Sequence, residues 1–207
     1  MRSALPRSFY LQPTLSVARQ LIGQHLVRKT AAGLQIGRIV ETEAYQGPKD
    51  LAAHSSRGRT ARTEVMFGAA GHAYVYLIYG FWNCLNVVTA EHGVPHAVLI
   101  RALEPVLGIT DTTHGPGLLC RALDIDRSLN GVDLTMSALW IEQPDDASYR
   151  KPRIARSTRI GVDYAGDWAK KPWRFFDARS PYVSTLSKAQ RQKALKGIGR
   201  TTTKKNA

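Results

Sequence analysis

One short part of this chain combines carboxylates, an imidazole and several aromatic rings. Two glutamates and a tyrosine stand in the stretch Glu41–Tyr45, His54 follows nine residues after Tyr45, and the aromatic run Tyr74–Gly80 comes next. A carboxylate or an imidazole can transfer protons, and aromatic rings can stack against a flat ring. Because the whole chain carries a formal charge of +13, it can attract a polyanion. The combination indicates chemistry on a nucleobase.

Glu41 and Glu43 are both candidates for a general base. Alternate residues of a β-strand point to the same face, so the two side chains are expected on one side of the strand that contains them. The residues by themselves therefore do not decide which glutamate would act.

The positive charge is unevenly distributed along the sequence. Residues 150–200 contain fourteen Arg or Lys against three acids, and 19 of the 29 basic residues of the chain are Arg. Arginine suits bidentate phosphate contacts, and a basic surface gives salt-sensitive affinity for nucleic acid. We therefore favour a nucleic-acid partner over the alternative that these charges only keep the protein in solution.

Length and composition exclude several classes of protein. A chain of 207 residues is long enough for one domain with a core but short for two. It has no apolar run of about 18 residues that could span a membrane, and its N-terminus lacks the apolar segment of a secretory signal. We expect a cytoplasmic, nucleoid-associated protein that does not bind membranes.

The potential metal ligands show no metal-binding spacing. Cys84 and Cys120 stand in apolar surroundings and form no CxxC pair, and the six histidines show neither H-x3-H nor HExxH spacing. We predict two buried free thiols and no metal site.

The order of sequence patterns predicts an α+β fold: a single domain with a mainly antiparallel, curved β-sheet and flanking helices. Gly80 is expected to break a strand pair, and the loop 46–71 is expected to be functional, because it is long and rich in Gly, Ser and Arg. Residues 1–8 and 197–207 are expected to be frayed. Helices are expected at 15–22 after an N-cap at Thr14, at 118–123 and at 184–195, and strands at 25–29, 34–45, 73–89, 97–103, 133–141, 157–166 and 171–176, with a polar turn at 143–147.

Five motifs in order carry a resemblance to a known family. They are Gly37–Tyr45, Asp50–His54, Tyr74–Gly80, Ile100–Pro105, and the segment from Arg159–Val162 to Ser180-Pro181. With these motifs the chain, from Thr14 to Ser184, resembles the alkyladenine (3-methyladenine) DNA glycosylase family. The resemblance implies a cofactor-independent enzyme that flips alkylated purines out of double-stranded DNA and hydrolyses them from the sugar, with deaminated purines as an open further class. The net charge and the lack of an exposed heptad or apolar stripe favour a monomer.

The resemblance also implies a role for each matching residue. It selects Glu43 as the general base, and it implies that Arg101 and the main-chain carbonyl of Ile160 hold the attacking water. The motifs Gly37–Tyr45, Asp50–His54, Tyr74–Gly80, Ile100–Pro105 and Arg159–Val162 contain no lysine, so no Schiff base and no strand-cutting lyase activity are expected. Base stacking and recognition are expected from Tyr45, Ala52, His54, Tyr76 and Asn86, intercalation from Tyr79 and Phe81, and phosphate contacts from Arg121, Arg153, Arg156, Lys170 and Lys171.

One departure from the family pattern concerns DNA affinity. Family members often carry a longer, Arg-rich segment where this chain has only Val106–His114. Arg121, Arg153 and Arg156 are the residues expected to compensate for it.

Three alternatives stay open on the residues alone. Tyr79 and Phe81 could be packed strand residues of the core, since aromatic strands are usually buried. The protein could bind nucleic acid without catalysis, or be a different hydrolase that uses Glu43 and His54.

Overall fold

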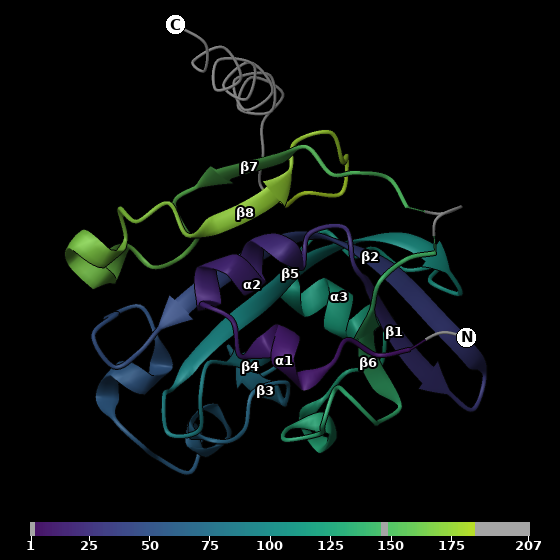
Figure 1. Cartoon of the computed structure of the whole chain (residues 1–207). Coiled ribbons are helices and arrows are strands. Elements are labelled where there is room, and N and C mark those ends of the chain that lie inside the picture. The colour runs from purple at the N-terminus through teal and green to yellow at the C-terminus, as the bar shows by residue number, and fades with distance from the viewer. Residues whose placement is uncertain (1–2, 146–148, 185–207) are drawn as a thin grey trace, which may run out of the picture.

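A curled, eight-stranded antiparallel sheet forms the body of the protein (Figure 1). The computed structural model describes residues 3–145 and 149–184. The strand order is β3-β4-β5-β2-β1-β6, and β8 pairs with both β2 and β7. This confirms the predicted α+β class with a curved antiparallel sheet. The strands are β1 His25–Thr30, β2 Gly33–Gln46, β3 Ala73–Ile78, β4 Trp82–Thr89, β5 His96–Leu107, β6 Leu139–Glu142, β7 Ile154–Ser157 and β8 Arg174–Asp177.

Strand β2 is the centre of the sheet and decides where the acids lie. Of its 14 residues, those from Ile36 to Gln46 pair with β5 along one edge. Along the other edge it pairs first with β1 and then, at Glu41–Glu43, with β8. With neighbours on both edges and layers on both faces, Glu41 and Glu43 have no exposed surface at all. A buried carboxylate needs hydrogen-bond donors or cations around it, so the fold requires a polar network at this position.

The β3–β4 hairpin ends in a tight turn at Tyr79-Gly80, where the sequence predicted a break. Both residues have positive φ angles, 54° and 79°, and the Phe81 amide donates to the Ile78 carbonyl at 3.3 Å. A positive φ is uncommon for a tyrosine, whereas glycine adopts it freely. The turn leaves Tyr79 79% and Phe81 67% exposed. The alternative that these two rings pack in the core is therefore wrong.

Short helices cover the sheet. The helices are α1 Arg7–Tyr10, α2 Thr14–Gln20 and α3 Pro116–Ala122, and the 3-10 turns are η1 His54–Arg57, η2 Glu64–Phe67, η3 Arg127–Leu129 and η4 Asp163–Trp168. Tyr10, Val17 and Leu119 from the three α-helices share one apolar core with the sheet residue Ile100. Thr14 does not cap α2 as expected; it is the first helical residue, and its hydroxyl lies 3.1 Å from Thr89 Oγ1.

The N-terminal end and one strand differ from the sequence expectation. From residue 3 onwards, the segment expected to fray is held on the domain: Ala4 bridges to Glu142, and the Leu5 amide donates to the Ile141 carbonyl at 2.7 Å. The strand expected at 133–141 is shorter, because Asp133 makes only an isolated bridge to His72 and regular pairing begins at Leu139. The expected helix 184–195, beyond its first residue, and the end 197–207 lie outside the described residues, as does part of the turn 143–147.

Candidate active site

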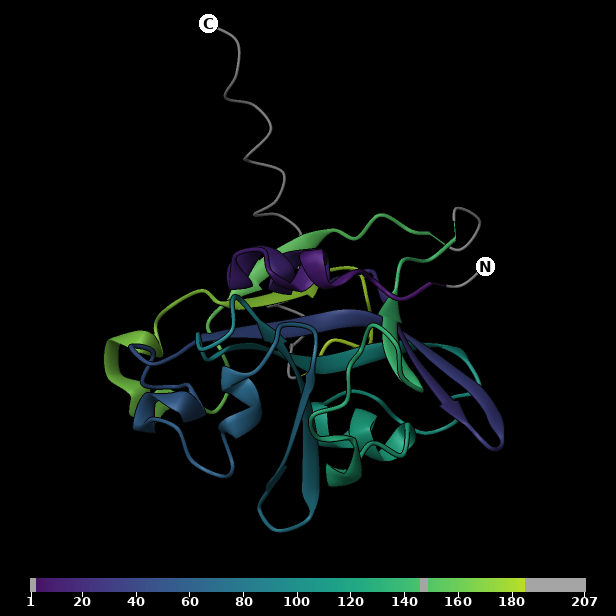
Figure 2. The same cartoon turned by 60° about the horizontal axis from the view of Figure 1, so that its bottom comes forward.

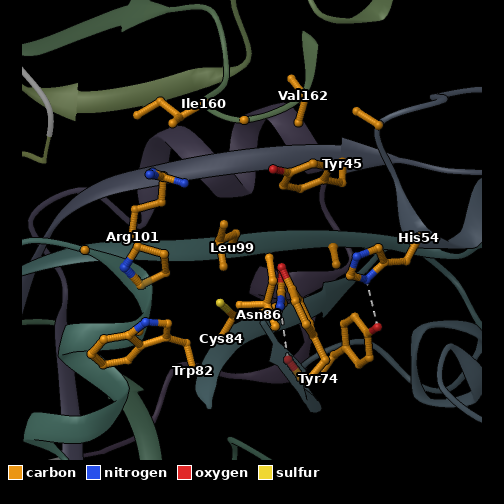
Figure 3. A pocket seen from close by; sticks show the side chains of 18 of the residues that line it. Tyr45, His54, Tyr74, Trp82, Cys84, Asn86, Leu99, Arg101, Ile160 and Val162 are labelled. Atoms are coloured by element: carbon orange, nitrogen blue, oxygen red, sulfur yellow. Dashed lines mark hydrogen bonds between the residues drawn. The ribbon is translucent and has the colours of Figure 1, made fainter. Parts of the chain in front are cut away.

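A cavity of about 490 Å³ opens between the β3–β4 hairpin, the exit of β2 and the loop that leads into η4 (Figure 3). That volume lies within the range of sites that bind small molecules, roughly 300–1,000 Å³. The cavity wall includes the predicted residues Tyr45, Ala52, His54, Tyr76, Tyr79, Asn86, Arg101 and Ile160. It also includes residues that were not among the predicted site residues, such as Tyr74, Trp82, Cys84, Gly115–Leu118, Val162 and Tyr164.

Aromatic rings from three segments form part of the cavity wall. The His54 ring lies 4.5 Å from the Tyr76 ring in an edge-to-face arrangement, and the Tyr74 and Tyr76 rings are 5.3 Å apart. Tyr45 enters from the exit of β2 (Figure 3). Such a wall offers ring faces and edges to a planar ligand, and aromatic stacking accepts many flat rings.

His54 is a neutral member of this wall. Burial lowers the pKa of its imidazole to about 4, and the positive charges of Arg62 and Arg57 act in the same direction. Its Nδ1 lies 3.0 Å from the Tyr74 hydroxyl (Figure 3). At neutral pH the ring can therefore serve as a hydrogen-bonding and stacking group but not as a cationic acid.

Asn86 and Ala52 contribute polar groups that are already partly engaged. The Asn86 side-chain amide donates to the Tyr74 carbonyl at 3.1 Å, which fixes its orientation in the buried wall. The Ala52 amide donates to Asp50 Oδ1 at 3.1 Å. The Ala52 carbonyl is the group that remains nearer the cavity rim, where the Tyr164 hydroxyl approaches it at 3.5 Å.

Glu43 lies directly behind the cavity wall. Its Oε1 accepts the Ile160 amide at 2.8 Å, and its Oε2 accepts the Tyr45 hydroxyl at 2.8 Å and Arg101 Nη1 at 3.4 Å. All three donors line the cavity, although Glu43 itself is one layer behind them. The group of Ile160 that touches Glu43 is its amide, whereas the resemblance drew attention to its carbonyl. Burial, and then the charge of Glu43, raise the pKa of the Tyr45 phenol, so its hydroxyl stays a donor.

Glu41 lies on the same strand, but most of its hydrogen-bond partners lie outside the cavity wall. Its Oε1 accepts Arg101 Nε at 3.1 Å and Arg174 Nε at 2.7 Å, and its Oε2 accepts the Ser184 amide at 2.7 Å. Arg174 and Ser184 do not line the cavity. The geometry thus separates two acids that the sequence left equivalent, because Glu43 contacts cavity residues through every bond and Glu41 shares only Arg101 with them.

A buried ion pair, which the sequence reasoning missed, joins the two loops of the cavity wall. Arg159 Nη2 donates to Asp50 Oδ1 at 2.8 Å, and both side chains have no exposed surface. Arg159 also donates to the Ala44 carbonyl at 2.9 Å, and its guanidinium lies 4.8 Å from the Tyr45 ring centre. Since Asp50 precedes Ala52 and Arg159 precedes Ile160, the pair fixes both loops relative to β2.

Comparisons with known proteins point to one family. A model of the methylpurine-DNA glycosylase family matches residues 8–181. The chain is 53% identical to a protein of Methanocella arvoryzae named "Putative 3-methyladenine DNA glycosylase", with 87% of this chain and 95% of that protein covered. Proteins of the same name from Legionella pneumophila strain Corby and Anaeromyxobacter sp. strain Fw109-5 are each 51% identical, with 87% of this chain and 97% and 92% of theirs covered.

The chain belongs to the methylpurine-DNA glycosylase family. The family expected from the motifs is confirmed. As a DNA glycosylase the protein is a hydrolase that acts on N-glycosyl bonds. Membership of this family implies that DNA is the substrate of the protein.

The residues expected to contact phosphate in this glycosylase lie in three places. Arg121 lies on α3, with its guanidinium 5.4 Å from the Trp82 ring of the cavity wall. Lys170 and Lys171 directly follow η4. Arg153 and Arg156 lie beside and in β7, which both views place on the side away from the β3–β4 hairpin (Figures 1 and 2).

Part of the basic C-terminal region is structural rather than exposed. Arg159 and Arg174 are only 5% and 4% exposed and bind buried carboxylates. The count of basic residues in 150–200 included these two arginines with those that could bind DNA, because a sequence does not show which arginines are buried.

Within residues 3–145 and 149–184, no cluster of three or more His, Cys, Asp or Glu side chains could hold a metal ion. No helix in the same part of the chain has the length and apolar character needed to cross a bilayer.

Proposed function

We propose that this glycosylase flips a damaged purine nucleotide out of double-stranded DNA into the cavity and hydrolyses its N-glycosidic bond with Glu43 as general base. The observation that carries the proposal is the placement of Glu43, a fully buried carboxylate bonded to three groups of the cavity wall. A carboxylate in such a position can stabilise the positive charge that develops on the sugar and can accept a proton from water.

The reaction needs a group that accepts one proton from water, and its leaving group is the purine. A water oxygen attacks C1′ while the bond between C1′ and the purine nitrogen breaks, and that electron pair leaves with the base. The proton lost by water passes to Glu43. Arg101, held at 3.1 Å by Glu41 and at 3.4 Å by Glu43, is positioned to orient the water, and the main chain at Ile160 borders the same space.

Alkylated purines fit a cavity without a general acid. A purine that carries a positive charge after alkylation leaves as a neutral molecule, so it requires no proton from the enzyme. His54, the imidazole in the wall, has a pKa of about 4 and is uncharged at neutral pH. Together with the stacking rings Tyr45 and Tyr76, this favours cationic or electron-poor purines.

Extrusion of the nucleotide leaves a gap in the duplex that must be filled. Tyr79, held outward by the hairpin turn and 79% exposed, has the exposure and shape of an intercalating wedge, with Phe81 beside it. Unstacking a base step requires about a few kcal/mol, which an inserted ring offsets. Both rings lie on the hairpin that borders the cavity.

The basic residues named above would hold the DNA backbone of one duplex bound to a monomer. Charge reversal at Lys171 is expected to weaken binding and reduce its salt dependence, since each lost phosphate contact lowers the salt slope by roughly one. The same change at Arg156 tests whether β7 reaches the DNA. An unchanged salt slope for Arg156→Glu removes Arg156 from the interface.

An alkaline cleavage assay tests the proposed function. The protein is incubated with an end-labelled duplex that contains one 3-methyladenine or hypoxanthine, and half of each sample is then treated with alkali. We expect strand breaks only at the lesion and only after alkali, because hydrolysis leaves an intact abasic strand. Retention of the duplex without any break would mark a binding protein without catalysis, and a break before alkali would show lyase activity.

A further inference from the structure

Two exposed aromatic side chains border the same cavity from different elements. Among the exposed large hydrophobic side chains of residues 3–145 and 149–184, Tyr79 and Tyr164 are the two that line the cavity. Tyr79 lies at the tip of the β3–β4 hairpin and Tyr164 in η4. Figure 2 shows the hairpin projecting downward and η4 at the left end of the molecule. The two residues therefore belong to elements that lie apart in this view, and both line the cavity.

The turn that carries Tyr164 is anchored on both sides of that residue. Val162 and Ala165 are buried at 4% and 0% exposure in a small apolar cluster that also contains Ala52. At the end of the turn, Arg159 Nη2 donates to the Trp168 carbonyl at 3.0 Å. With its neighbours buried and its turn bonded to an internal arginine, Tyr164 is directed outward by the backbone and is still 72% exposed.

The position of the Tyr164 ring distinguishes it from an ordinary surface aromatic. Single exposed aromatic residues are normal on proteins and need no functional explanation. Tyr149, 46% exposed, is one such residue and does not line the cavity. Tyr164 instead contacts the cavity, and its hydroxyl points toward the Ala52 carbonyl at 3.5 Å. A tyrosine with one apolar face and one polar tip at a rim is suited to a ligand that is partly flat and partly polar.

We propose that Tyr164 is a second aromatic contact to DNA, on a different element from Tyr79, and that its ring packs against the extruded nucleotide and retains it in the cavity. The inference rests on the base flipping proposed above. It separates two tasks: Tyr79 fills the space left in the duplex, whereas Tyr164 slows the return of the nucleotide to it. Loss of the ring should therefore lower the fraction of DNA in the flipped state.

The test follows flipping and chemistry separately. The duplex carries a lesion next to 2-aminopurine, whose fluorescence rises when its neighbour leaves the stack, and single-turnover base release is measured on the same DNA with excess protein. For Tyr164→Ala we expect an about tenfold lower flipping equilibrium constant and an about tenfold slower release, with unchanged thermal unfolding. Met136→Ala, a change at an 81% exposed residue outside the cavity, is the matched control and should match the parent.

Tyr164→Phe distinguishes the ring from the hydroxyl. Retention of flipping and release in this variant is expected, because the proposed contact is made by the ring. If the phenylalanine variant is as impaired as the alanine variant, the hydroxyl acts instead and the packing role is overturned. If the parent flips and releases the base and Tyr164→Ala does the same at equal rates, the inference about Tyr164 fails while the proposed function stands. If the parent releases no base, the proposed function itself fails, and this inference with it.

Discussion

The corner formed by Glu43 and its partners Tyr45, Arg101 and Ile160 lies beside the same cavity as the hairpin tip around Tyr79. The two regions differ in burial and in the kind of bonds that hold them. Glu43 itself is fully buried, and its bonds include one to a residue far away in sequence, Ile160, which is 117 positions from it. The tip is exposed and is shaped by a local bond between Phe81 and Ile78. Catalytic groups require fixed positions in a dry site, whereas a wedge must be free to enter another molecule. Variants of the two regions should therefore fail in different ways.

The largest effect is expected for Glu43→Gln, which removes the proton acceptor and preserves the shape of the side chain. Base release in single turnover should fall by roughly 10²- to 10⁴-fold, the usual contribution of a general base. Binding of damaged DNA should stay within about twofold, because the stacking wall and the wedge are intact. Quench-flow release assays and fluorescence anisotropy measure the two quantities. Parent-like turnover would falsify the assignment of Glu43.

Glu41→Gln is the matched change at the other glutamate of β2, two residues before Glu43. It should mainly lower the free energy of unfolding. The variant removes the buried carboxylate that pairs with Arg174 and one of the two that pair with Arg101, and breaking a buried ion pair typically costs about 3–5 kcal/mol. Urea unfolding followed by circular dichroism gives the free energy of unfolding. We expect the remaining folded protein to release base faster than Glu43→Gln does. A stable Glu41→Gln protein with no activity would contradict this division between the two acids.

His54 tests the cavity wall by its pH dependence. The pKa of its imidazole is about 4 in the folded protein, below the ordinary value of 6.5, because of burial and then Arg62 and Arg57. The unfolded chain therefore binds more protons between these values, so stability is full above pH 6.5 and falls as the pH drops towards 4. The loss at pH 5 should be about 2 kcal/mol. In His54→Gln, urea unfolding at pH 5 and 7 should show a smaller difference; an equal difference would assign the effect to other groups.

The smallest effect is expected at the hairpin tip, with Tyr79→Ala. The ring makes no core contact at 79% exposure, so the free energy of unfolding should change by less than about 0.5 kcal/mol. Affinity for a damaged duplex should fall about tenfold, because an aromatic contact to bases is worth about 1–3 kcal/mol. Titration calorimetry of the duplex and urea unfolding check both values. A loss of stability as large as that of Glu41→Gln would show that the tip and the corner are one cooperative unit.

Much of the fold could be predicted from local patterns. The hairpin of β1 and β2, the break at Tyr79-Gly80 and the helix after Pro116 follow from alternation, glycine and proline, which act over a few residues. The strand expected at 133–141 was too long. Residues with high β-propensity form a strand only where a neighbouring strand pairs with them, and local patterns do not show where that neighbour lies. Local patterns also predicted a frayed N-terminal segment. The hydrogen bond that holds this segment to β6 joins residues more than a hundred positions apart, so local patterns do not reveal it.

The sequence by itself determined the family, the class of fold and the set of side chains that can act on a nucleobase, because motifs and periodicity are local properties of the chain. Only the tertiary structure decided that Glu43 is bonded to residues of the cavity wall while Glu41 binds Arg174, that Arg159 is a buried support rather than a phosphate ligand, and that Tyr164 lines the cavity. Burial and hydrogen-bond partners depend on which strands become neighbours, and those neighbours come from distant parts of the chain.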